Sequence, residues 1–438
     1  MTPGARLQAA IELLDEVEVT PRPADAVISA FFRARRFIGA KDRAAVAETV
    51  YGVLRRHARL RWWFTHAGGF PITARTLLIA DQILAQGRPA DHLDKLFSGG
   101  RFAPAEFSAG EIKLANKLEG HTLDHPDMPE QVQVECPDWA AGLLREFLGD
   151  RFVPELAALL DPAPLDLRVN TVKGDRDAAI AALASAGIEG EATRWSPFGV
   201  RIHGRPPLAS TDAFKAGLVE IQDEGSQLIG LLTDAKPGHQ VVDFCSGAGG
   251  KALAIAAGMQ NKGRLVACDV LEKRLKRAAE RFRRAGLHNI ETRPLASERD
   301  PWVKRHKGKF DRVLVDAPCT GTGTWRRNPD SRWRLLGPGL EELLKLQHSI
   351  LDSAARLVKP GGRLIYATCS MLPQENERQI DAFLAAHPDF TVKPVDDLWE
   401  QAVGTASPGT GPYMRLSPAR HGTDGFFAGV MERGSAVE

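Results

Sequence analysis

The sequence predicts an α/β protein in which a domain built on a parallel sheet follows an all-α domain and a small α/β segment. Three observations lead to this prediction. Apolar residues recur at helical spacing near the N-terminus, β-like and helical stretches alternate after about residue 225, and a glycine-rich turn follows the first of those strands. The chain has 438 residues, 43% of them hydrophobic and 26% charged, which is enough for two or three globular domains.

The helical domain is expected over residues 1–135. Its apolar positions repeat with the period of an amphipathic helix, as at Leu7, Ile11, Leu14 and Val17. Nine Lys and Arg residues stand against two acids between Phe31 and Arg61, a local charge of +7, although the whole chain carries only +2. A second basic stretch, between Pro301 and Arg334, has a local charge of +6. Such stretches either contact phosphates or form solvated helix faces, and charge alone leaves both interpretations open.

Two further domains are expected, a small α/β subdomain over residues 136–224 and a parallel-sheet domain over residues 225–438. Alternation of strands and helices indicates parallel βαβ units. In the last domain we expect strands at 240–244, 264–269, 289–292, 312–316 and 363–368, helices at 272–285 and 340–357, and a closing antiparallel pair at 413–416 and 425–431.

Composition argues against secretion, membrane insertion and metal binding. The N-terminus lacks a basic segment followed by an apolar run, and no stretch of about 18 apolar residues occurs. The five cysteines include no C-x-x-C pair, and the twelve histidines form no cluster at ligand spacing. We therefore expect a cytoplasmic protein without a metal.

A glycine-rich turn, QVVDFCSGAGGKA over residues 240–252, joins the first strand of the last domain to a helix. Such a turn lets the backbone approach a ligand and directs free N–H groups at it. Gly247, Gly249 and Ala252 fit the G-x-G-x-x-A pattern of dinucleotide enzymes. Asp269, at the end of the second strand, is suitably placed to hold two ribose hydroxyls. These features fit either adenosine-containing cofactor, a nicotinamide dinucleotide or S-adenosylmethionine.

Two cysteines at neighbouring strand ends narrow the choice. Cys319 follows the fourth strand together with Asp316, and Cys369 follows the fifth, so both thiols are expected beside the cofactor. Carbon 5 of cytosine becomes nucleophilic enough to accept a methyl group once a thiolate has added to carbon 6. Asp316 is our candidate for orienting the base and stabilising charge near ring N3, and Cys319 for assisting release of the adduct.

Several short stretches together resemble the RsmB/Sun/Nop family of RNA cytosine-5 methyltransferases. They are DFCSGAGGK, Asp269, DAPCTGTG, RRNPDSRW and ATCSMLPQENE, with LRVNTVK, IQDEGSQ and HGTDGFF as flanking motifs, from about residue 165 to the end. The first domain, best over residues 41–64, is similar to the NusB-like RNA-binding domain of the RsmB branch. The resemblance implies a class I S-adenosylmethionine-dependent methyltransferase (Rossmann-like) catalytic domain after an all-α NusB-like domain.

The resemblance also implies residue roles. Cys369 would be the attacking thiolate, Cys319 would help product release, and Lys251 would point toward the reacting base. The expected cofactor-binding residues are Cys245, Ser246, Gly247, Ala248, Gly249, Gly250, Lys251, Asp269, Arg274 and Asp316. The family turn A-A-P-G-G-K-T reads differently here, with Ser246, Gly247, Ala248 and Ala252 at the corresponding places. The acid that the family commonly carries after the third strand is replaced by residues 294–297, PLAS.

The expected function is methylation of carbon 5 of a cytosine in ribosomal RNA, with 16S RNA favoured, by a monomer whose partner is RNA. The segment 324–335, which mixes arginines with Trp325 and Trp333, is expected either to grip the RNA strand or to be an ordinary surface loop. The alternatives are a methyltransferase acting on tRNA or another RNA, a nicotinamide-dependent oxidoreductase, and a non-catalytic RNA-binding ribosome assembly factor.

Overall fold

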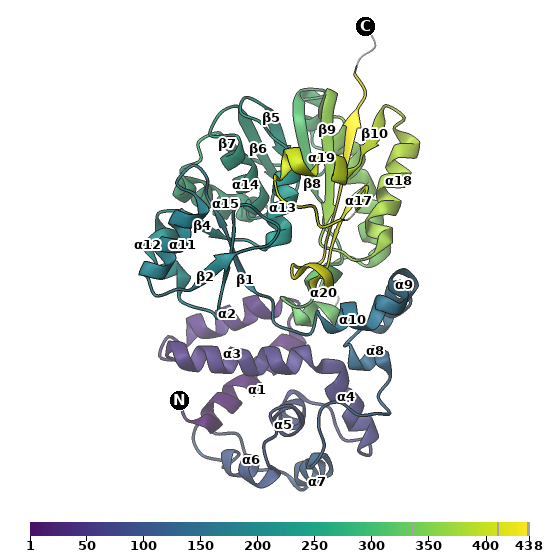
Figure 1. Cartoon of the computed structure of the whole chain (residues 1–438). Helices are drawn as coiled ribbons and strands as arrows, with labels where there is room; N and C mark the ends of the chain where they lie inside the picture. Colours follow the sequence, from purple (N-terminus) through teal and green to yellow (C-terminus); the bar gives the residue numbers. More distant parts are fainter. Residues whose placement is uncertain (335, 410, 436–438) are drawn as a thin grey trace. The chain divides into compact units, whose positions relative to one another are not determined.

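A computed structural model describes residues 1–334, 336–409 and 411–435, which form two compact units (Figure 1). The first, here called the helical unit, comprises Met1–Pro162 and Trp325–Gly337. The second, the sheet unit, comprises Ala163–Thr324 and Pro338–Glu438. The predicted division into three domains at residues 135 and 224 stays a prediction. No helix in the described part of the chain is long and apolar enough to cross a membrane.

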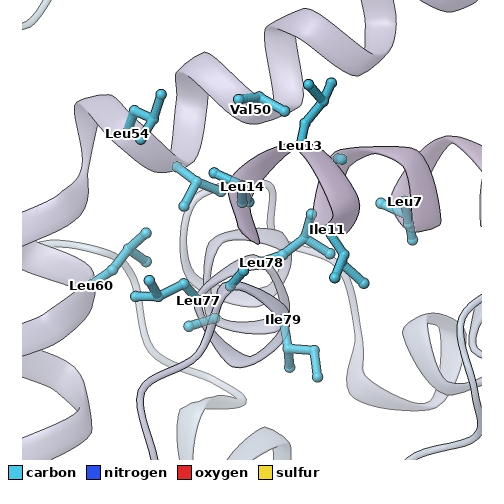
Figure 2. Close-up of a cluster of buried hydrophobic side chains, with 14 of the residues drawn as sticks. Leu7, Ile11, Leu13, Leu14, Val50, Leu54, Leu60, Leu77, Leu78 and Ile79 are labelled. Atoms are coloured by element: carbon cyan, nitrogen blue, oxygen red, sulfur yellow. The ribbon is translucent and has the colours of Figure 1, made fainter. Parts of the chain in front are cut away.

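The helical unit is built as the apolar spacing predicts. Leu7, Ile11, Leu14 and Val17 are all buried on one face of α1, and Figure 2 shows three of them packed with leucines of the neighbouring helices. The Thr2 hydroxyl begins α1 by accepting from the backbone N–H of Ala5. The helices are α1 (Pro3–Val19), α2 (Ala24–Ala34), α3 (Ala40–Arg55), α4 (His57–His66), α5 (Ala74–Leu84), α6 (Ala90–Leu96), α7 (Ala109–Leu118), α8 (Glu130–Gln133), α9 (Asp138–Leu148) and α10 (Phe152–Ala157), with a short turn η1 (Gly149–Arg151).

The segment Trp325–Gly337 belongs to the helical unit although it lies far away in sequence. Arg332, only 1% exposed, donates to the backbone oxygens of Glu135 (3.0 Å) and Leu159 (2.7 Å). Burial lowers the pKa of this guanidinium to about 10. The Asp330 carboxylate accepts from the N–H of Ala24 at 2.9 Å, at the start of α2. A short turn, η4 (Pro329–Arg332), lies within the segment.

These contacts bear on the two interpretations of the segment, an RNA-gripping segment or an ordinary surface loop. Trp325 is fully buried, and the Trp139 ring meets it edge-on with centroids 6.1 Å apart. Trp333 stacks on His57 at 4.9 Å. Arginines beside tryptophans are typical of RNA contacts, but the buried ring of Trp325 is not available as a stacking surface. Trp333 is partly exposed, so an RNA contact of this part of the segment stays a prediction.

A four-stranded antiparallel sheet opens the sheet unit, in the order β2-β3-β1-β4. The elements are β1 (Leu165–Val169), α11 (Arg176–Ser185), β2 (Gly190–Ala192), β3 (Gly199–Ile202), η2 (Leu208–Ser210), α12 (Asp212–Lys215) and β4 (Val219–Ile221).

An eight-stranded sheet forms the rest of the unit, with the path β10-β12-β9-β8-β5-β6-β7 and β11 paired to β12. The neighbours from β9 to β7 are parallel, whereas β12 is antiparallel to β9, β10 and β11. All five predicted strands and the closing antiparallel pair are confirmed. The strands are β5 (Gln240–Asp243), β6 (Arg264–Asp269), β7 (Ile290–Pro294), β8 (Phe310–Asp316), β9 (Val358–Thr368), β10 (Phe390–Lys393), β11 (Met414–Leu416) and β12 (Phe426–Arg433).

Helices cover both faces of this sheet through two separate cores. One core contains Leu228, Ala278 and Trp399, and the other contains Ile350 and Ile380. The helices and short turns are α13 (Glu224–Leu232), α14 (Gly250–Gly258), α15 (Glu272–Ala285), α16 (Pro301–Arg305), η3 (Thr322–Thr324), α17 (Leu340–Ala355), η5 (Pro373–Glu375), α18 (Glu377–Ala386), α19 (Val395–Ala402) and α20 (Pro418–His421). Strand order reverses between β5 and β8, the point at which open α/β sheets bind ligands at the carboxyl ends of their strands.

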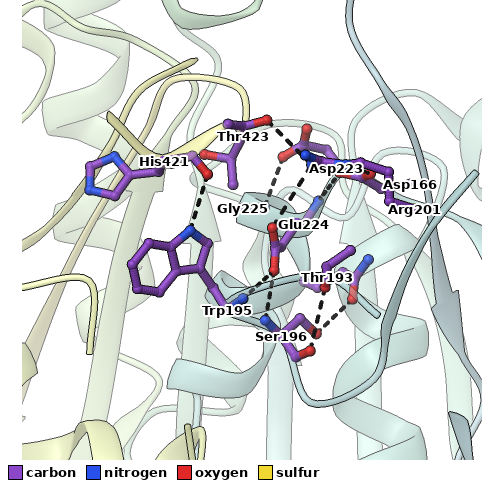
Figure 3. Close-up of polar contacts among 12 residues, drawn as sticks. Asp166, Thr193, Trp195, Ser196, Arg201, Asp223, Glu224, Gly225, His421 and Thr423 are labelled. Carbon is purple, nitrogen blue, oxygen red and sulfur yellow. Dashed lines mark hydrogen bonds and ion pairs between the residues drawn. The ribbon is translucent and has the colours of Figure 1, made fainter. Parts of the chain in front are cut away.

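A buried polar cluster joins β1 and β3 of the small sheet to α13 and to the turn before β12 (Figure 3). Glu224, at the start of α13, accepts from the backbone N–H groups of Trp195 (2.5 Å) and Ser196 (2.8 Å). Arg201 donates to Asp166 at 2.7 Å and to the backbone oxygen of Gly422 at 3.3 Å. These bonds fix the small sheet against α13, the helix that precedes β5 and the glycine-rich turn.

Candidate active site

The turn between β5 and α14 requires glycine at two positions. Gly247 and Gly249 have φ angles of 56° and 78°, and a Cβ on Gly249 would lie 2.5 Å from the ring of Phe282. The Asp269 carboxylate accepts from the N–H groups of Gly247 (2.8 Å) and Leu271 (2.7 Å), which ties the end of β6 to the turn. Each carboxylate oxygen keeps a second lone pair, so the residue can still accept from ribose hydroxyls.

Buried polar atoms without partners mark the same turn. Asp243 is 1% exposed, and its carboxylate oxygens and the hydroxyl of Ser246 lie close to each other without another hydrogen-bond partner among the described residues. Burial raises the pKa of Asp243 to about 7, and the neighbouring Asp316 adds to the rise. A buried polar atom without a partner is costly, so polar groups of a cofactor at this turn would satisfy these atoms.

The other cofactor residues expected from the sequence lie around this turn. Arg274, on α15, extends to within 3.8 Å of the position that a Cβ on Gly247 would occupy. Asp316 lies at the end of β8 and Lys251 in the first turn of α14. Cys245, Ser246 and Ala248 form the turn itself, and Gly250 is the first residue of α14. The residues present therefore fit an adenosine-containing cofactor.

The two cysteines expected at the strand ends lie together. The Sγ atoms of Cys319 and Cys369 are 3.4 Å apart, and both side chains are partly exposed. The hydrogen bond between the sulfurs raises the pKa of the Cys319 thiol well above its ordinary value, and burial adds to the rise. Cys319 therefore keeps its proton, and its S–H group can donate to the sulfur of Cys369. In contrast, Cys136 and Cys268 are buried thiols, and burial raises the pKa of both.

Glu375, the last residue of η5, and Asn376, which follows it, hold the backbones on which the two cysteines lie. The fully buried carboxylate of Glu375 accepts from the N–H of Thr320 at 2.9 Å, directly after Cys319. Asn376 donates to the backbone oxygen of Ser370 (2.9 Å) and accepts from the hydroxyl of Thr368 (2.6 Å), the residues on either side of Cys369. Sequence reasoning assigned no role to these two residues, although they belong to the ATCSMLPQENE motif.

Lys251 and Asp316 form an ion pair beside the cysteines, with Nζ and Oδ2 2.6 Å apart. Burial lowers the pKa of Lys251, but the Asp316 carboxylate outweighs it, so the pKa is raised and the ammonium is retained. The ammonium also lies 5.7 Å from the centre of the Phe426 ring, at the start of β12. Phe426 was not predicted as a site residue, although the HGTDGFF motif that contains it was noticed.

The region after β7 has two acids close in sequence to residues 294–297, Glu298 and Asp300. Asp300 accepts from the N–H groups of Ala296 (2.9 Å) and Trp302 (2.8 Å), and these backbone bonds lower its pKa. Its carboxylate therefore caps α16. Among the residues that the structure describes, no group of three or more His, Cys, Asp or Glu side chains could hold a metal ion.

Comparison with known proteins gives consistent matches over nearly the whole chain. The model of the 16S rRNA methyltransferase RsmB/F family matches residues 231–432, and that of the RsmF/B-like ferredoxin-like domain matches residues 136–209. The chain is 30% identical over 410 residues to the probable ribosomal RNA small subunit methyltransferase B of Synechocystis sp., covering 90% of this chain and 91% of that protein. It is also 30% identical over 399 residues to ribosomal RNA small subunit methyltransferase B of Citrobacter koseri, covering 88% and 90%.

A solved structure agrees with this result. The crystal structure of the protein PH0851 matches with a TM-score of 0.80 at 28% identity and covers 99% of both chains. The fold and the matches together define an S-adenosylmethionine-dependent RNA methyltransferase with a Rossmann-like catalytic domain. The chain belongs to the RsmB/F family of 16S rRNA methyltransferases. The expected family, fold class and cofactor are thereby confirmed, and the nicotinamide-dependent oxidoreductase is not supported.

Proposed function

We propose that this enzyme transfers a methyl group to carbon 5 of a cytosine in 16S ribosomal RNA, with Cys369 as the nucleophile. The proposal depends chiefly on the separation of 3.4 Å between the sulfurs of Cys369 and Cys319, with the proton held on Cys319. The relatives named above are ribosomal RNA small subunit methyltransferases, which favours this RNA as the substrate. We further propose that the protein acts as a monomer in the cytoplasm.

The chemistry begins with the thiolate of Cys369, whose electron pair forms a bond to carbon 6 of the cytosine. The ring electrons released by this addition make carbon 5 nucleophilic. Bound S-adenosylmethionine supplies an electrophilic methyl group at this site. Asp316, held by Lys251 at 2.6 Å, accepts from the exocyclic amine of the base and fixes its orientation. Asp243, Ser246 and Asp269 are the residues that would hold the cofactor.

Release of the product breaks the bond between the sulfur of Cys369 and carbon 6 that formed in the first step. Once carbon 5 carries the methyl group, its proton passes to a base, and the C–H electron pair forms the double bond between carbons 5 and 6 as the bond from carbon 6 to the sulfur of Cys369 breaks. The electron pair of that bond leaves with the sulfur, so the thiolate is regenerated. The S–H group of Cys319 stabilises this departing thiolate through the hydrogen bond that the structure shows between the two sulfurs.

Two cysteine variants test this scheme. Cys369→Ala should abolish methylation while keeping affinity for S-adenosylmethionine in calorimetry, because its thiol is proposed to bond to RNA only. Cys319→Ala should accumulate a covalent protein–RNA adduct on denaturing gels, because adduct formation persists while release is slowed. Cys136→Ala, in the helical unit, is the matched control and should do neither. Full turnover by Cys369→Ala would remove the mechanism, and bisulfite sequencing of ribosomal RNA with and without the enzyme identifies the modified cytosine.

A further inference from the structure

The turn between α2 and α3 in the helical unit presents a large aromatic side chain to solvent. Phe37 is 82% exposed, whereas Phe31 and Phe32, in the preceding helix, are buried. One exposed apolar residue is ordinary on a protein surface, so exposure alone does not indicate a binding site. Two further properties, a fixed backbone and a surrounding positive charge, distinguish this position.

The backbone on both sides of Phe37 is held by the protein itself. Arg43 donates from Nε to the carbonyl oxygen of Ile38 at 2.6 Å and from Nη2 to that of Arg36 at 3.1 Å. The side chain of Ile38 is 2% exposed and packs in the core, and its N–H donates to the carbonyl oxygen of Arg35 at 3.0 Å. Phe37 therefore projects from an ordered turn, and little conformational entropy remains to be lost when a ligand contacts it.

The exposed charged residues that flank Phe37 in the sequence are cations without acidic partners among the residues that the structure describes. Arg33, Arg36 and Lys41 are exposed, and within the described part of the chain none of them forms an ion pair. The adjacent acid, Asp42, is already neutralised, since it accepts from the N-terminal amine at 2.8 Å and from Arg6 at 2.7 Å. We call Arg33, Arg36, Phe37 and Lys41 the α2–α3 corner. Its three cations stand within four residues of Phe37 in the sequence.

We propose that the α2–α3 corner binds an unpaired segment of the substrate RNA, with one base stacked on Phe37 and the flanking phosphates near the three cations. Bases in single strands stack on aromatic side chains, and cations beside them gain affinity by releasing counterions from the phosphates. In duplex RNA the base faces are already stacked on one another. This inference deepens the function proposed above, on which it rests in taking RNA as the substrate.

Fluorescence anisotropy with the full chain tests the proposal. The probe is a labelled, unstructured RNA of about twelve nucleotides, within the range of single-strand site sizes. Phe37→Ala should weaken binding about five- to 140-fold, the effect of losing one stacked base, whereas Phe37→Trp should bind like the wild type. The matched control is Val19→Ala, because Val19 is equally exposed at 83% but follows the exposed acid Glu18, and its affinity should not change.

The cations have a separate readout. Arg36→Gln and Lys41→Gln should each reduce the slope of log affinity against log salt by about 0.7 for each phosphate that the variant no longer neutralises. Unchanged slopes in both variants would contradict the assigned pairing of these cations with phosphates. A hairpin-free RNA duplex of the same length is the second probe, and Phe37→Ala should bind it as the wild type does.

Three outcomes would overturn the inference. These are equal affinity of Phe37→Ala and wild type for the single strand, an equal loss with Val19→Ala, or an equal loss for the single strand and the duplex. Circular dichroism confirms that each variant is folded. Because the assay measures binding without methylation, its result is independent of the nucleophile: full turnover by Cys369→Ala would refute the proposed mechanism and leave the anisotropy result unaffected.

Discussion

Glu375→Ala should destabilise the sheet unit and slow methylation, because this carboxylate holds the backbone beside Cys319. Its Oε1 atom accepts from the N–H of Thr320 (2.9 Å) and from the amide of Gln347 (3.0 Å), and its Oε2 atom accepts from the hydroxyl of Thr320. Gln347 also donates to the carbonyl oxygen of Pro318, and a hydroxyl can rotate, so the main loss falls on the N–H of Thr320. A buried donor left unpaired costs about 1–3 kcal/mol, and a bond to a charged group contributes a similar amount. We expect a total loss of about 3 kcal/mol.

The assay compares two substitutions at the same position. In Glu375→Gln the carbonyl oxygen can still accept from Thr320 and Gln347, and the new amide faces a hydroxyl that can accept, so the loss should stay below about 1 kcal/mol. Thermal unfolding should show a Tm on the order of 10 °C lower for Glu375→Ala and little change for Glu375→Gln. Single-turnover methylation should be slowed only by the alanine. Equal damage from both variants would refute the reasoning, since it would show that charge rather than hydrogen-bond geometry matters.

Three other buried side chains give measurable predictions. Asp243 has a pKa of about 7 in the folded protein against 3.8 in an unfolded chain. Its contribution to stability is therefore full below pH 4 and is lost as the pH rises to 7. In urea unfolding without cofactor, Asp243→Asn should be more stable than the wild type by roughly 4 kcal/mol at pH 8, and this advantage should disappear toward pH 4. Arg332→Met should cost the helical unit about 2–4 kcal/mol in urea unfolding, because three carbonyl oxygens lose their donor; an unchanged midpoint would contradict this. Leu13→Ala, at a fully buried position, should cost about 2–5 kcal/mol by the same measurement, whereas Val19→Ala should be nearly neutral.

The parts of the site that the sequence indicates are those at the ends of strands. Cys319 and Cys369 stand at the carboxyl ends of β8 and β9, which are parallel neighbours, so topology alone brings them to one edge. The glycine-rich turn is recognisable because positive φ angles at Gly247 and Gly249 exclude most other residues. In both cases a local pattern carries a geometric requirement, which is why these positions could be found without coordinates.

The residues that sequence reasoning missed act through partners distant in the chain. Glu375 lies 55 residues from Thr320, and nothing in the local sequence identifies which backbone group a buried carboxylate will meet. The same holds for Arg332, whose acceptor Leu159 is 173 residues away. An arginine near tryptophans has the same local composition in an RNA-binding loop and in a packed core, so composition could not separate the two.

The return of Trp325–Gly337 to the helical unit limits how this enzyme can be dissected. A truncated protein starting at residue 163 would retain two tryptophans and a buried arginine without the helices that shelter them, and it should aggregate. A fragment ending at residue 162 would in turn lose the donor for the carbonyl oxygens of Glu135 and Leu159. Chimaeras with relatives must therefore exchange both pieces of the helical unit together.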